Sequence, residues 1–147
     1  MTGTRNLARL VVVIALISAF SACTAITVKP IDASIGLHHV CIHQNPKVLV
    51  TDFVQVVRDG FMRHGISTEV FSGTAPEGCE YILTYTALRS WDIVPFLSHA
   101  ELYLKHEGRT VASAEFHLKG KGGYALTKFQ GTKKKMDPVI NQLLAAY

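Results

Sequence analysis

Residues 96–119 read FLSHAELYLKHEGRTVASAEFHLK, and apolar and polar residues alternate on both sides of residues 106–108. A period of two is typical of β-strands that have one buried and one solvated face. Gly108 suits the left-handed position of a three-residue hairpin loop. The stretch therefore predicts an antiparallel hairpin, with strands at 96–105 and 109–119, that covers a core on one side only.

A helical periodicity precedes this hairpin. Between Lys47 and His64 the apolar residues recur at the spacing of an amphipathic helix. Asn45 and Pro46 supply an N-cap and a first-turn proline, and Gly65 ends the helix. We expect this helix to lie with its apolar face on the sheet.

Three further runs predict strands at 35–43, 66–71 and 79–89, because they are rich in β-branched and aromatic residues. A second amphipathic helix closes the chain and starts at either Thr132 or Asp137. The element order is β-α-β-β-β-β-α. We predict an α/β protein of the α+β type, with one mixed, mostly antiparallel sheet and two helices packed on one face.

The amino terminus has the features of a bacterial export signal. Arg5 and Arg9 precede an apolar run at 10–20, which is too short for the roughly 20 residues of a membrane-spanning helix. Ser21-Ala22-Cys23 fits the lipoprotein cleavage motif, and an ordinary secretory cut near Ala22 is the alternative. We predict a signal peptide at 1–22, a lipidated tether at 23–34 and a single domain at 35–147.

Lipidation of Cys23 would decide where the protein resides. Palmitate and other acyl chains on one terminus anchor firmly, since each buried methylene contributes about 0.8 kcal/mol. Thr24 follows the cysteine, where Asp would mark inner-membrane retention. We expect an outer-membrane lipoprotein whose domain faces the periplasm. Cleavage removes two arginines and no acid, which leaves a net charge of +2 and no case for nucleic-acid binding.

The other two cysteines constrain the sheet. In an oxidising compartment Cys41 and Cys79 form a disulfide that contributes roughly 3–4 kcal/mol, and two independent buried thiols are the alternative. A right-handed crossover places strand 66–71 parallel to strand 35–43. The loop that follows is short, so we expect strand 79–89 to return antiparallel and to lie beside strand 35–43.

Four long segments of the sequence resemble a known protein family. The runs HGISTEVFSG, CEYILTYTALRSWD, LSHAEL and LTKFQGTKKKMDPVI resemble a small family of Gram-negative lipoproteins of unknown function. This resemblance implies a lipid anchor and carries no activity. The element order is also similar to the lipopolysaccharide-assembly lipoprotein and, more loosely, to the amino-terminal domain of the Tol translocation protein, and those likenesses concern architecture alone.

Two groups of residues are candidates for binding. Arg89, Trp91 and Asp92 end a strand, and Trp with Arg is typical of protein-contact hot spots. The alternative is a tryptophan on the rim of the core with the two charges paired over it. A set of lysines could contact lipid or lipopolysaccharide phosphate, or serve solubility alone: Lys119, Lys121, Lys128, Lys133, Lys134 and Lys135.

Two histidine groups lie on predicted strand faces. His39, Cys41 and His43 share a face and could bind zinc, but pairing of Cys41 with Cys79 removes the thiolate. The polar face of the hairpin carries His99, Glu101, Glu115 and His117, and a three-residue loop pairs His99 with Glu115; we interpret these as ordinary cross-strand contacts. No nucleophile or phosphate-loop motif appears, so we expect no enzyme activity, no cofactor and no metal.

The sequence thus favours a membrane-anchored periplasmic lipoprotein that acts by binding. We expect a protein-binding accessory of an outer-membrane or envelope assembly, with an envelope protein as its partner. A binding module for an envelope glycolipid or glycan is the alternative.

Overall fold

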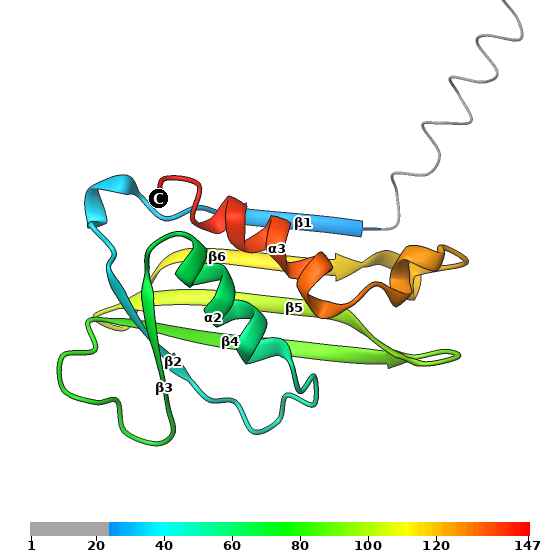
Figure 1. The fold of residues 1–147 in the computed structure, drawn as a ribbon, viewed down its shortest axis with the longest axis horizontal. Helices are drawn as coiled ribbons and strands as arrows, with labels where there is room; N and C mark the ends of the chain where they lie inside the picture. Colours follow the sequence, from blue (N-terminus) through cyan, green and yellow to red (C-terminus); the bar gives the residue numbers. More distant parts are fainter. Residues whose placement is uncertain (1–23) are drawn as a thin grey trace, which may run out of the picture.

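The computed structural model describes residues 24–147, so the predicted signal peptide and Cys23 lie outside the described residues. One mixed six-stranded sheet has the order β1-β6-β5-β4-β2-β3, and both α-helices lie on the same face of it (Figure 1). This confirms the predicted fold class. The strands are β1 (Thr24–Lys29), β2 (His39–His43), β3 (Ser67–Phe71), β4 (Tyr81–Trp91), β5 (Pro95–His106) and β6 (Arg109–Leu118), and the α-helices are α2 (Phe53–Arg63) and α3 (Thr132–Leu143). Short 3-10 turns lie at η2 (Ala33–Ile35), η3 (Lys119–Gly122) and η4 (Leu126–Phe129).

The two helices cover the apolar face of the sheet. From α2, Phe53 and Phe61 are fully buried, and alternate residues of β5 and β6 are buried on the covered face. The helices approach each other at Gly60, where a Cβ would lie 2.8 Å from Ile140 Cδ1. α3 begins at Thr132, the earlier of its two predicted starts.

The helix α2 begins later than predicted. Asn45 does not cap it, because its side chain donates to the Tyr85 carbonyl (2.9 Å) and accepts from the Lys47 amide (3.1 Å) in a turn. The helix starts only at Phe53, after Asp52. The Asn45 side chain, which the local sequence pattern predicted to cap the helix, is therefore used in a tertiary hydrogen bond to β4.

The hairpin of β5 and β6 turns more tightly than predicted. Glu107 and Gly108 both have positive φ, so the loop has two residues and His106 pairs with Arg109. The register shifts by one residue at Leu104/Lys105, so that residues paired across the two strands again point to the same face of the sheet. As a result His99 faces His117 and not Glu115, which corrects the predicted register.

The predicted tether is wrong for its described residues. Residues 24–29 form β1, which pairs antiparallel with β6 from Thr24↔Leu118 to Lys29↔Ser113. The chain beyond β1 is also held, since the Ile31 amide donates to the Leu143 carbonyl (2.9 Å). The free edge of β6 supplies backbone partners that a local reading of this Pro-containing segment does not reveal.

The disulfide lies near the other edge of the sheet, on β2. Cys41 and Cys79 are bonded, with Cα atoms 5.8 Å apart, as predicted. β4 lies beside β2 as expected, but it runs parallel to β2 and not antiparallel. Cys41 alternates with the core residues Val40 and Ile42, so residues 72–80 cross β2 on the face away from the helices. A return on the opposite face keeps this second crossover right-handed.

Candidate functional site

Four segments meet at one end of the sheet, which we call the anchored end. Thr24 faces Leu118, His117 faces His99, and Leu88 faces His99, so the start of β1, the end of β6 and the β4–β5 turn share this end. Residues 119–131 follow β6 there (Figure 1). Because β1 begins at Thr24, the predicted lipidation residue Cys23 immediately precedes this end of the domain in the sequence.

Large apolar side chains are exposed at the anchored end. Trp91 is 73% exposed, Ile93 79% and Leu126 81%. Exposed apolar surface that gathers in one place marks contact sites on proteins. We call the group the end patch, and its members are Leu88, Trp91, Ile93, Val94, Tyr124 and Leu126.

A buried lysine connects the two loops that carry the end patch. Lys128 Nζ donates to the Asp92 carboxylate (2.5 Å) and to the Gly123 carbonyl (2.7 Å), and it lies near the Phe129 ring. The loops at 92–94 and 123–128 are thereby fixed relative to each other. The patch is preformed in this arrangement, which lowers the entropy cost of binding.

The structure corrects the predicted role of two lysines. Lys128 is buried in the contacts above, and Lys135 Nζ donates to the Leu97 and Lys128 carbonyls. Burial lowers the pKa of Lys135 to about 8. Neither side chain is available to an anionic ligand. Of the predicted set, Lys119, Lys121 and Lys134 are exposed, and Lys133 is paired with Asp137 (2.5 Å).

Trp91 does not close the rim of the core. Trp91 is largely exposed, and Asp92 pairs with Lys128 and not with Arg89. The alternative of a tryptophan on the core rim, with Arg89 and Asp92 paired over it, is therefore wrong. The sequence interpretation missed the other members of the end patch. Ile93 and Val94 stand in a turn where polar residues are usual, and that signal could have identified them.

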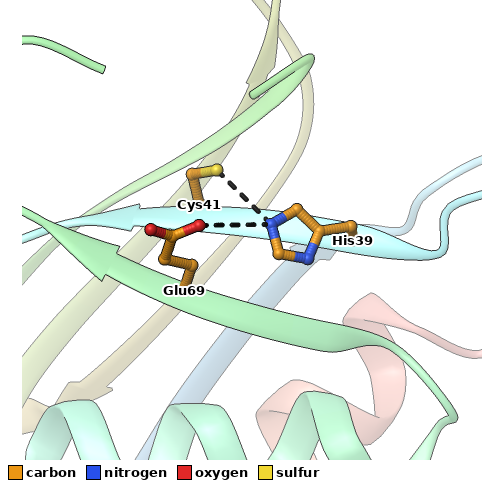
Figure 2. A group of neighbouring side chains, drawn as sticks. All are labelled: His39, Cys41 and Glu69. Atoms are coloured by element: carbon orange, nitrogen blue, oxygen red, sulfur yellow. Dashed lines mark hydrogen bonds and ion pairs between the residues drawn. The ribbon is translucent and has the colours of Figure 1, made fainter. Parts of the chain in front are cut away.

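The first histidine group lies on β2 and β3. Figure 2 shows His39 directed toward Cys41 and Glu69, with its Nε2 3.6 Å from Cys41 Sγ and 4.0 Å from a Glu69 oxygen. Cys41 is in the disulfide and provides no thiolate, and His43 stacks on Phe71 instead of joining the group. This cluster therefore lacks the sulfur ligand that a zinc site here would use.

The second histidine group lies on β5 and β6, nearer the anchored end. His99 Nδ1 and His117 Nδ1 are 3.2 Å apart, and His99 Nε2 donates to the Glu101 carboxylate (3.1 Å). Glu115 lies 3.9 Å from His99 Nδ1. His99, Glu115 and His117 line a hollow of about 550 Å³ together with Leu88, Ser90 and Lys121. The sequence predicted that they cluster but paired them wrongly.

Comparison with known proteins shows the fold alone. No protein-family model matches the chain, and no curated protein matches it. Among solved structures, a PelC variant dodecamer from Paraburkholderia phytofirmans superposes with a TM-score of 0.54 at 13% identity, over 84% of this chain and 95% of that one. A second structure of the PelC dodecamer from the same organism superposes with a TM-score of 0.51 at 12% identity, over 84% of this chain and 96% of that one. A minor lipoprotein from Acinetobacter baumannii superposes with a TM-score of only 0.36 at 11% identity, over 74% of this chain and 90% of that one.

The PelC likeness places this chain in a class of mixed-sheet α+β domains. The likeness to the lipopolysaccharide-assembly lipoprotein and the Tol domain stays a prediction. Within residues 24–147, no helix is both long and apolar enough for a membrane crossing.

Proposed function

We propose that this protein is an outer-membrane lipoprotein, anchored through Cys23, that acts as the protein-binding accessory of an envelope assembly. One observation carries the proposal: the end patch lies where β1 begins, directly after the predicted lipidation site. Acyl chains on Cys23 would hold this end of the sheet at the membrane surface. The partner would then be a protein that lies in the membrane or against it.

The composition of the end patch favours protein as its partner. Arg89, two residues before Trp91 in β4, is also exposed, and Trp and Arg are the residue types that contribute most at interfaces. The PelC structures are dodecamers, which supports a second copy of this chain as the first partner to test. In the described sheet β1 and β3 are edge strands, and edge strands can pair between copies.

Envelope glycolipid is the alternative ligand. Lys119 and Lys121 are exposed at the anchored end beside the end patch. Each lysine near an anionic membrane surface contributes about 1 kcal/mol to binding. These two residues would contact lipid phosphate while the apolar side chains reach the acyl region.

A crosslinking experiment in intact cells distinguishes a protein partner from a glycolipid ligand. A photoreactive amino acid replaces Ile93, and the same amino acid at Met62 on α2, which is 59% exposed, serves as control. We expect a protein adduct from position 93 only, at a multiple of the chain's own mass if the partner is a second copy. Adducts with lipid alone would favour the glycolipid, and identical adducts from both positions would contradict a specific patch.

The anchor itself is tested by metabolic labelling with a fatty-acid analogue. The wild-type protein should take up label, and Cys23→Ala should take up none, because the thiol is the acyl acceptor. Equal label on both proteins would contradict lipidation at this cysteine.

A further inference from the structure

The second histidine group has the geometry of metal ligands. In a tetrahedral zinc site the nitrogens lie 2.0–2.1 Å from the ion, which places two of them about 3.4 Å apart. His99 Nδ1 and His117 Nδ1 are 3.2 Å apart, and the two residues lie opposite each other in the pair at the end of the β5–β6 ladder. The two strands hold the nitrogens at this distance through the register of the sheet, not through a flexible loop.

The orientation of His99 suits an ion. Its Nε2 donates to the Glu101 carboxylate (3.1 Å), so the hydrogen of the neutral ring is on Nε2 and the lone pair is on Nδ1. Metal-binding histidines commonly donate their other N–H to a carboxylate in this way. Glu101 is therefore in the place of a positioning residue that directs His99 Nδ1 toward a ligand.

Glu115 completes a set of three ligands. One ligand atom each from His99, Glu115 and His117 lies within 4.8 Å of the others. Its carboxylate is 3.9 Å from His99 Nδ1 and is half exposed, so a small side-chain rotation brings it to ligand distance. The neighbouring residues on β1 are Ala25 and Thr27, whose small side chains leave the position accessible.

The charge around the group also favours a cation. Within residues 24–147, the one basic side chain that pairs with Glu101 and Glu115 is His99. The pKa of the nearby Tyr103 is raised, first by the charge of Glu101 and then by burial and by Glu115. Neither carboxylate is paired with a lysine or arginine of residues 24–147, and Lys121, which also lines the hollow, contributes the opposing positive charge.

We infer that the open face of the sheet binds one Zn²⁺ through His99 Nδ1, His117 Nδ1 and the Glu115 carboxylate, with Glu101 orienting His99. Three protein ligands leave a coordination position for water or a ligand in the hollow. The inference departs from the metal-free domain that the sequence predicted, and it does not depend on lipidation or on the end patch. The cluster on β2 and β3 differs because its sulfur is in the disulfide.

The test is zinc titration of the full chain. The protein is purified in detergent, stripped with chelator and titrated with ZnCl₂ by calorimetry. We expect one equivalent to bind, with affinity reduced about 100-fold or more in His117→Ala and about 10–100-fold in Glu101→Gln, the usual range for residues that orient a ligand. His39→Ala is the matched control and should bind as the wild type does.

Two further measurements keep the result interpretable. Thermal melts of the variants in chelator show whether each one folds, and Glu101→Gln removes a charge at almost unchanged volume. Co²⁺ in place of Zn²⁺ should give visible absorption without a thiolate charge-transfer band. No binding, unchanged affinity in folded His117→Ala and Glu101→Gln, or loss of binding in His39→Ala would each overturn the site and leave a plain histidine–histidine hydrogen bond.

Discussion

The two faces of the sheet are built from alternate residues of the same strands, but one face stabilises the fold and the other is open to solvent. On the helix-covered face Leu102 and Leu104 of β5 are fully buried, while His99, Glu101 and Tyr103 of the same strand lie on the open face. The covered face holds the apolar contacts that stabilise the fold. The open face carries the disulfide and both histidine groups, and neither α-helix of residues 24–147 lies over it. Substitutions on the two faces should therefore separate into effects on stability and effects on binding.

The largest loss of stability should come from the covered face. Phe53→Ala removes a side chain with no exposed surface that stacks on Tyr85, at 5.4 Å between ring centroids. Urea unfolding should show a loss of about 3–5 kcal/mol, the cost of a large-to-small core change. Leu49→Ala, at a residue 59% exposed, is the control and should change stability by less than about 0.5 kcal/mol. Equal effects would mean that the helix does not pack as described.

The disulfide should be the main stabilising element of the open face. Cys41 and Cys79 are separated by 38 positions, and a bridge of that span contributes about 3–4 kcal/mol by the chain-entropy estimate. Reductant should lower the melting temperature of the wild type and leave that of the Cys41→Ser, Cys79→Ser double variant unchanged. Two freely alkylatable thiols in the oxidised protein would contradict the bridge.

A pH effect should arise at the rim of the covered face. Burial lowers the pKa of Lys135 to about 8 from 10.5, so above pH 8 the folded protein binds fewer protons than the unfolded chain. The free energy of unfolding should rise by roughly 1–2 kcal/mol between pH 8 and pH 10. Lys135→Met should abolish this rise when followed by denaturant melts across that range. A stability that falls over the same interval in the wild type, but not in the variant, would reverse the predicted sign.

The smallest effect on stability should come from the end patch. Trp91 is the single tryptophan of the chain and is largely exposed, so Trp91→Ala should cost under about 1 kcal/mol. The same change should remove the protein adduct formed from position 93. A thermal melt and the crosslinking experiment on one variant measure both. A loss as large as that of Phe53→Ala would show that Trp91 belongs to the core.

Pattern reasoning succeeded where side-chain direction is a local property. The alternation at 96–119 identified both strands, the polar group on them and the covered face, because successive strand residues point to opposite sides whatever the strand pairs with. The helical spacing likewise identified α2 and α3. The disulfide followed from cysteine number once export was assumed.

The sequence by itself determined which residues face the core and which face solvent, since the period of a strand or helix is a property of the backbone. Only the tertiary structure decided pairing. A two-residue turn set His99 against His117, the edge of β6 turned a predicted tether into β1, and residues 72–80 crossed β2 so that β4 runs parallel to it. The turn is local, but its length and the register shift beside it set the pairing of the hairpin. The other two cases depend on hydrogen bonds between segments distant in the chain, where the free edge of one strand selects its partner, and no local pattern records that selection.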